Sequence, residues 1–252
     1  MLVFDVKITV IEALKPLSAR SFTNSGLTID ISEADLIYTE TLMQRGKEIY
    51  EGKEIVILGG GDGALLYELL KENPKFVWML EIDELVMRAC NKYLKSICGD
   101  LHSNYGCKGP GMIPSATENK IGIETAFLLS PRKIIVEDCM LTVNQFIKEG
   151  KKVDFIFGDL TDIPISDSAC GELWEFMITI LQSAFKILKP TGKFMTHGNG
   201  ATCPESLELY EQELMKLKPP VHFTKTKAFV PSFLEDWIFY QITFKTTDNG
   251  DA

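Results

Sequence analysis

The sequence predicts an α/β fold with a doubly wound, mostly parallel sheet that ends in an antiparallel hairpin. Short apolar runs rich in β-branched residues alternate five times with segments of helical periodicity. The first run leads into a glycine cluster at 59–63, as in a tight turn from a strand into a helix. Beyond residue 220, two strand-like stretches follow one another without a helix between them, which is typical of a hairpin.

The sequence divides into a small N-terminal element and a main domain. Residues 1–31 contain two β-like stretches joined by a polar link, so we expect a small N-terminal β element there. The main domain then spans residues 32–252. Ser32 and Asp35 form a capping-box-like start, and apolar positions at helical spacing predict a helix from there to about Tyr50.

The next segment has the pattern of strand, glycine turn, helix, strand and acid. The run at 55–58 is apolar on consecutive positions, which predicts a strand buried on both faces. Leucines at helical spacing over 64–70 predict a helix, and Pro74 closes the segment. A second strand is expected over 76–80, with Glu81 directly after it.

The middle of the chain contains an unusual connection. A helix is expected over 85–97, stopped by Gly99. Glycines and prolines then crowd a segment without clear periodicity, which predicts an inserted surface loop at about 103–133. A third strand over 133–137 follows, ended by Asp138 and Cys139, and after it a helix that continues to Glu149.

The last third of the chain completes the sheet. We expect the fourth strand over 153–157, a helix over 173–188 and the fifth strand over 193–196. Pro204 suits a first helical turn, so a helix is expected from there to about Leu217. The hairpin occupies the remaining residues. This arrangement is Rossmann-like and of the type used by nucleoside-sulfonium-dependent transferases such as methyltransferases.

Composition and charge exclude several classes of function. The 252 residues carry a net charge of −9, so a nucleic acid is not expected as a partner. No apolar run approaches the ~18 residues that span a membrane, and the start lacks the pattern of a secretory leader. The six cysteines show no paired spacing, and Cys98, His102 and Cys107 match no common zinc pattern. We therefore expect a cytoplasmic protein with reduced thiols and no metal or cofactor.

The glycine turn has the spacing of a nucleoside site. Gly59, Gly61 and Ala64 fit the G-x-G-x-x-G/A pattern, and Glu81 follows about 20 residues later, where a carboxylate can accept hydrogen bonds from ribose. The alternative is a tight turn followed by a surface acid. Asp62 lies inside the turn and would repel a pyrophosphate. A cationic ligand beside a nucleoside therefore fits better than a dinucleotide.

Acidic residues follow four of the predicted strands. They are Asp62 after the first strand, Glu81 and Asp83 after the second, Asp138 after the third and Asp159 after the fourth. One such acid is usually a helix cap or a solvated loop residue. Because ligands of doubly wound sheets bind at the carboxyl ends of the strands, acids after four strands in this register favour a site.

At these residues the sequence resembles a known family. The motifs are GGGDG at 59–63, LEID at 80–83, EDC at 137–139, GDLT at 158–161, WEF at 174–176 and PSFLEDW at 231–237. Together they resemble the polyamine aminopropyltransferases over about 26–103 and 134–245, and within that family they are most similar to the animal spermine synthases. The resemblance implies transfer of an aminopropyl group from decarboxylated S-adenosylmethionine, a co-substrate, to spermidine. The products would be spermine and methylthioadenosine.

The resemblance also implies roles for individual residues. Asp159 would accept the proton, with Asp62 beside it in the catalytic centre. The residues implied for the polyamine are Tyr38, Asp62, Phe233 and Glu235. The residues implied for the nucleoside are Gly59, Gly61, Glu81, Asp138 and Cys139. The form GDLT favours spermidine over putrescine as acceptor. Spermine synthases also carry an N-terminal domain tied to dimerisation, so a homodimer is expected for the full-length protein.

The sequence departs from the family pattern at three places, and two other functions stay open. Phe233 stands where the motif has tyrosine, a glutamine expected within 1–31 has no clear match, and 103–133 replaces a shorter connection. These departures motivate the alternative of a catalytically impaired homologue that acts as a structural partner. A methyltransferase that uses S-adenosylmethionine is the other alternative, although Asp62 and Glu235 suit a polycationic acceptor better.

Overall fold

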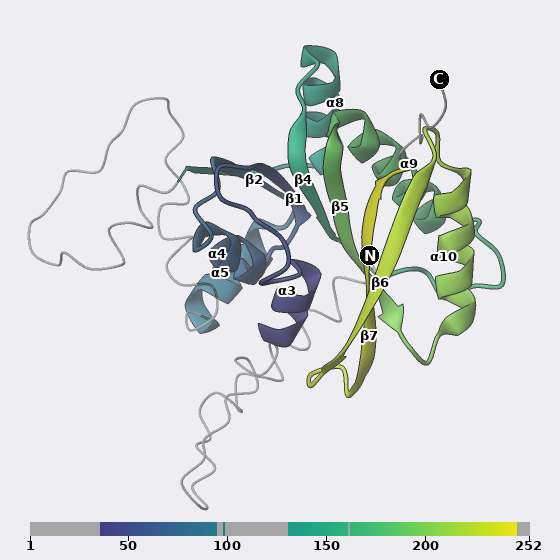
Figure 1. Cartoon of the computed structure of the whole chain (residues 1–252). Coiled ribbons are helices and arrows are strands. Elements are labelled where there is room, and N and C mark those ends of the chain that lie inside the picture. The colour runs from purple at the N-terminus through teal and green to yellow at the C-terminus, as the bar shows by residue number, and fades with distance from the viewer. Residues whose placement is uncertain (1–35, 95–97, 99–130, 161, 246–252) are drawn as a thin grey trace, which may run out of the picture.

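A computed structural model describes residues 36–94, 98, 131–160 and 162–245. Its centre is a seven-stranded sheet in the order β3-β2-β1-β4-β5-β7-β6 (Figure 1). The strands are β1 (Glu54–Gly59), β2 (Phe76–Glu81), β3 (Arg132–Val136), β4 (Val153–Asp159), β5 (Leu188–Gly200), β6 (Val221–Val230) and β7 (Glu235–Phe244). The first five strands run parallel, and the hairpin β6–β7 joins antiparallel to β5. The predicted doubly wound α/β fold with a C-terminal hairpin is confirmed.

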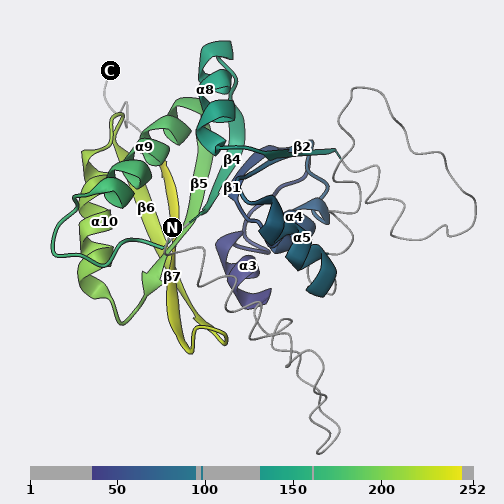
Figure 2. The ribbon, with the colours of Figure 1, turned by 180° about the vertical axis from the view of Figure 1, so that it is seen from behind.

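The helices cover the sheet in two groups. They are α3 (Leu36–Leu42), α4 (Ala64–Leu70), α5 (Glu84–Tyr93), α8 (Cys139–Glu149), α9 (Glu172–Ile187) and α10 (Pro204–Lys216). Figure 1 and, from behind, Figure 2 show α3, α4 and α5 on one side of the molecule and α8, α9 and α10 on the other. The chain order reverses between β1 and β4, which places the switch point of the sheet at the end of the glycine-turn strand.

The core consists of one apolar cluster on each face of the sheet. Val56, Leu58 and Ile156 pack toward the cluster that includes α8, α9 and α10, whereas Ile55 and Ile57 pack toward the cluster that includes α4. All five side chains are buried. Successive side chains of a strand point to opposite faces, so a strand covered on both faces needs apolar residues at consecutive positions. This requirement explains the unbroken apolar run that predicted β1.

The helix predicted from residue 32 to about Tyr50 is too long at its C-terminal end. Helix α3 ends at Leu42, and a series of turns follows. Gln44 has a φ of 47° and Gly46 a φ of 76°, both in the left-handed region, which a continuing helix excludes. Met43 is nevertheless fully buried. The apolar pattern therefore continues past the helix because the turn itself packs into the core.

The ends of other helices and strands also differ from the predicted ones. Helix α5 ends at Tyr93 rather than at 97, with the Leu94 N–H bonded to the Cys90 carbonyl. Strand β5 extends well beyond 193–196, because it is paired on both sides, by β4 and by β7. Strand β3 begins at Arg132, so the predicted insertion ends before residue 133. The rest of that insertion and the predicted β element of residues 1–31 lie outside the described residues.

Three further features concern only the parts of the chain that the structure describes. None of their helices has the length and apolar character needed to cross a membrane. No three potential metal ligands gather within them. Among their cysteines, Cys139, Cys170 and Cys203 are free thiols.

Candidate active site

The glycine turn lies directly against the end of β4. Gly59 is paired with Asp159, and the Gly60 N–H donates to the Asp159 carbonyl at 3.0 Å. A Cβ on Gly59 would lie 2.1 Å from that carbonyl oxygen, and the φ of Gly59 is +84°. Only glycine tolerates both the close approach and the left-handed backbone. The turn thus passes beside Asp159, as expected from the position of both at the carboxyl ends of their strands.

Asp159 accepts a hydrogen bond from a tyrosine far away in sequence. The Tyr38 hydroxyl of α3 donates to Asp159 Oδ1 at 2.9 Å. Burial of the phenol, followed by the charge of Asp159 and this hydrogen bond, raises the pKa of Tyr38 well above its usual value. The charges of Asp162 and Asp62 add to this shift. The phenol therefore keeps its proton and remains a donor, and three carboxylates surround it.

Aromatic rings enclose Tyr38. Its ring centroid lies 5.2 Å from that of Phe239, 5.9 Å from His197 and 6.0 Å from Phe233. Phe233 belongs to the turn between β6 and β7, is 44% exposed, and lies 4.5 Å from the ring of Trp237. The hairpin thus supplies an aromatic wall that fixes the position of the tyrosine ring.

His197 also lies at the candidate site, although no motif in the sequence indicated it. It lies in β5 and is 7% exposed. Its Nδ1 lies 3.1 Å from the Gly198 carbonyl and 3.7 Å from Asp162 Oδ1. Its position directly after the predicted fifth strand matches that of the acids after the other strands, and that position is the signal that would have found it.

A second group of predicted residues gathers beside β2. Glu81 Oε1 accepts from the Asp83 N–H at 2.8 Å, and Oε2 lies 2.8 Å from the place that a Cβ on Gly61 would take. Burial raises the pKa of the Cys139 thiol to about 12, with smaller contributions from the charges of Asp138 and Glu81. The predicted nucleoside residues Gly61, Glu81, Asp138 and Cys139 are therefore neighbours.

Some of the strand-end acids are helix or turn caps. Asp83 Oδ1 accepts from the N–H groups at the start of α5, and Asp138 Oδ1 accepts from the Met140 N–H at 2.9 Å at the start of α8. Asp62 Oδ1 accepts from the Ala64 N–H at 3.0 Å. These bonds orient the carboxylates of Asp62 and Asp138 at the rim of the site. The presence of Asp83 after β2 is explained by its role as the N-cap of α5.

Glu235 stands apart from the tyrosine and its aspartates. Its carboxylate accepts from the Thr202 hydroxyl at 2.6 Å and occupies the space that a Cβ on Gly200 would need. This position is at the carboxyl end of β5, on the same edge of the sheet. Within the described residues, no hydrogen bond joins Glu235 to Tyr38 or Asp159.

Comparison with known proteins identifies the family to which this chain belongs. The spermine/spermidine synthase domain matches residues 35–250. A polyamine aminopropyltransferase of Pyrobaculum islandicum is 28% identical over 186 residues, which are 72% of this chain and 53% of the relative. The thermospermine synthase ACAULIS5 of Arabidopsis thaliana is 26% identical over 208 residues, with 81% and 52% coverage. The chain thus spans about half the length of these curated relatives.

Solved structures share the fold. A spermidine synthase in complex with the transition-state analogue AdoDATO superposes with a TM-score of 0.57 at 19% identity, covering 84% of this chain and 61% of that one. Spermidine synthase from Thermotoga maritima gives 0.54 at 18% identity, covering 84% and 60%. Because the domain match covers most of the sequence and includes the glycine turn and every site residue above, the chain belongs to the spermine/spermidine synthase domain family.

Proposed function

We propose that this protein is a polyamine aminopropyltransferase that uses decarboxylated S-adenosylmethionine to convert spermidine into spermine. The observation that carries the proposal is the Tyr38–Asp159 hydrogen bond at the edge of the glycine turn. It puts a carboxylate with one fixed oxygen at the switch point of the sheet, next to the group of residues around Glu81 that suits a nucleoside.

The chemistry requires a base at this point. A polyamine nitrogen has a pKa near 10.4 and is almost wholly protonated at neutral pH. It must lose a proton before its lone pair attacks the carbon beside the sulfonium. The new N–C bond forms as the C–S bond breaks, and sulfur leaves as the neutral thioether of methylthioadenosine. Because the sulfonium is already a good leaving group, the reaction needs no metal or cofactor.

Asp159 is the best candidate for the base. Its Oδ1 is occupied by the Tyr38 hydroxyl, whereas Oδ2 lies 3.6 Å from the position of a Cβ on Gly60. Oδ2 is therefore directed toward the glycine turn, where the sulfonium carbon would lie. Acids also raise the pKa of a bound amine, which opposes its deprotonation. Placement of Oδ2 on the reacting ammonium, away from water, offsets that effect.

The surrounding groups suit a polycationic acceptor. Asp62 and Asp162 lie close enough to Tyr38 to affect its pKa, and Glu235 lies further along the same edge. These carboxylates would bind the ammonium groups of spermidine that do not react. The exposed face of Phe233 would contact the methylene chain between them.

The group around Glu81 would hold the nucleoside. Glu81 is 9% exposed, and its carboxylate adjoins Gly61, where the backbone has no side chain in the way. It would accept hydrogen bonds from the ribose hydroxyls, and Asp138 and Cys139 would contact the adenine. Since the pKa of Cys139 is raised to about 12, the thiol stays neutral and does not repel the base.

Glu81→Gln is expected to weaken binding of methylthioadenosine by about 1–3 kcal/mol, the usual cost of losing hydrogen bonds to a charged group. Titration calorimetry measures this directly. Glu84→Gln is the control, because Glu84 lies three residues away and pairs with Arg88 on the surface. Equal affinities of wild type and Glu81→Gln would contradict the ribose assignment.

Phe233→Tyr is expected to lower the KM for spermidine roughly 2- to 10-fold, which corresponds to one added hydrogen bond of about 0.5–1.5 kcal/mol. The ring is partly exposed, so the hydroxyl adds without being buried. Steady-state kinetics should show an unchanged KM for decarboxylated S-adenosylmethionine. An unchanged KM for spermidine would mean that this departure from the family motif has no effect on the acceptor.

A product assay separates the proposal from the two alternatives. The purified chain is incubated with decarboxylated S-adenosylmethionine and either putrescine or spermidine, and in parallel with S-adenosylmethionine and the same amines. We expect spermine from the spermidine sample alone. Methylated amines would indicate a methyltransferase, whose co-substrate carboxylate would have to lie near Asp62 and Asp159. No product in any sample would favour a structural partner.

A further inference from the structure

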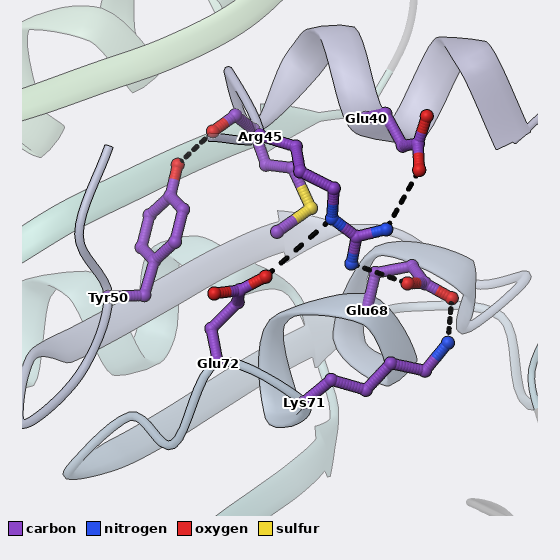
Figure 3. A network of polar contacts seen from close by, with 7 residues as sticks. Glu40, Arg45, Tyr50, Glu68, Lys71 and Glu72 are labelled. Carbon is purple, nitrogen blue, oxygen red and sulfur yellow. Dashed lines mark hydrogen bonds and ion pairs between the residues drawn. The ribbon is translucent and has the colours of Figure 1, made fainter. Parts of the chain in front are cut away.

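Arg45 lies in the turn after α3 and binds three carboxylates. Its Nη1 donates to Glu40 at 2.8 Å, its Nη2 to Glu68 at 2.6 Å, and its Nε lies 3.6 Å from Glu72 (Figure 3). Burial disfavours the charged guanidinium, but the bonds to Glu68 and Glu40 outweigh this effect, so the pKa of Arg45 is raised. Arg45 therefore stays charged and connects the end of α3 with α4.

Glu68 is the buried member of this cluster. Its side chain is 3% exposed, and it also accepts from the Lys71 ammonium at 2.5 Å. A buried carboxylate is tolerated only when it is paired and hydrogen-bonded. Lys71 is the C-cap residue of the same helix, three residues after Glu68, so it adds no link to another element. Arg45 supplies the link between helices.

Both of the linked helices are connected to Asp159. Helix α3 carries Tyr38, which donates to the Asp159 carboxylate, and α4 begins directly after the glycine turn, which bonds to the Asp159 backbone. Helix α3 has only seven residues and depends on tertiary contacts for its position. The Arg45–Glu68 contact is therefore one of the contacts that hold α3, with its tyrosine, beside the turn.

We propose that Arg45 is a positioning residue that keeps the Tyr38 hydroxyl on Asp159 and so directs the free oxygen of Asp159 to the reacting amine. The proposal rests on the proposed function for its kinetic consequences but not for its structural ones. Arg45 touches neither proposed substrate site. A second bond, from Gln44 Nε2 to Thr226 Oγ1 at 3.1 Å, attaches the same turn to β6. Without Arg45 the turn is thus expected to stay folded while α3 shifts.

Arg45→Gln is the first test, with Lys71→Gln as the matched control. Both changes remove one cation from Glu68, but only the first breaks the link between α3 and α4. We expect Arg45→Gln to lower kcat about 10- to 100-fold, the scale of a small misplacement at a catalytic group. The KM for decarboxylated S-adenosylmethionine should stay within about twofold, and Lys71→Gln should resemble wild type. Equal effects of the two variants would overturn the proposal.

Combination with Tyr38→Phe tests whether Arg45 acts through the tyrosine. If it does, Arg45→Gln causes little further loss of kcat in the Tyr38→Phe background, because the hydrogen bond to Asp159 is already gone. Independent losses that multiply would overturn the proposal. If Arg45→Gln does not fold, Arg45→Lys replaces it in both tests, since lysine keeps the charge but lacks the planar fork that reaches several carboxylates.

A readout without turnover separates this proposal from the proposed function. Proteins labelled with ¹³C at tyrosine Cζ are titrated to high pH, and the Tyr38 signal is assigned by its loss in Tyr38→Phe. Release of α3 exposes the phenol and removes it from Asp159, so the pKa of Tyr38 should fall in Arg45→Gln. Loss of a nearby positive charge alone would raise it. A raised or unchanged pKa would overturn the proposal even in an active enzyme, and a lowered pKa would support it even in an inactive chain.

Discussion

Asp159→Asn is expected to lower turnover by about 10²–10⁴-fold, the usual contribution of a positioned proton acceptor. The amide keeps the shape of the side chain and can still accept from the Tyr38 hydroxyl, but it has almost no basicity. Affinity for methylthioadenosine should change little, because Glu81 and its neighbours lie on the other side of the glycine turn. Single-turnover kinetics and calorimetry measure the two effects separately.

Asp162→Asn is the comparison for this variant. Asp162 lies three residues later, its side chain is 68% exposed, and it faces His197. Its loss should raise the KM for spermidine and affect kcat far less than Asp159→Asn does. If Asp159→Asn retains near-full aminopropyl transfer at neutral pH, the proton leaves by another group or by water, and the assigned base is wrong.

Gly59→Ala is expected to destabilise the fold strongly. A non-glycine residue in the left-handed region costs about 1–2 kcal/mol by itself. Here the added Cβ would also lie 2.1 Å from the Asp159 carbonyl, so two central parallel strands would have to separate. We expect the free energy of unfolding to fall by more than about 4 kcal/mol, which marks an exceptional single substitution.

Gly52→Ala is the matched control in urea denaturation. Gly52 has a φ of +70°, but a Cβ there would have no atom within 4 Å. This variant therefore measures the backbone term without the clash, and it should lose about 1–2 kcal/mol. Equal losses for the two alanine variants would show that the turn moves away from Asp159 at no cost, contrary to the described geometry.

The parts of the site that follow from strand order were predictable from sequence. Apolar runs predicted the strands. The strand order reverses next to the glycine turn, which puts the ends of β1 and β4 side by side. Gly59 and Asp159 are 100 residues apart, yet each is the last residue of its strand, and the two are paired. The carboxyl-end rule for doubly wound sheets is therefore sufficient to bring them together.

Contacts that depend on side chains from unrelated elements were not predictable. The end of α3 was misplaced because a buried turn and a buried helix both show apolar residues, here Leu42 and Met43. The position of His197 after the fifth strand could be read from the sequence, but its contacts with Tyr38 and Asp162 could not, because both residues come from other elements. The Arg45–Glu68 link joins two elements by charge, and charges on a helix usually indicate only a solvated face.

Coupled product formation tests the central claim most directly. The purified wild-type chain and Asp159→Asn are each given spermidine and decarboxylated S-adenosylmethionine, and spermine and methylthioadenosine are quantified together by mass spectrometry. We expect equal molar amounts of both products from wild type and a loss of both, by at least about 10²-fold, in the variant. Methylthioadenosine without spermine, or no product from a folded wild-type chain that binds methylthioadenosine, would contradict it.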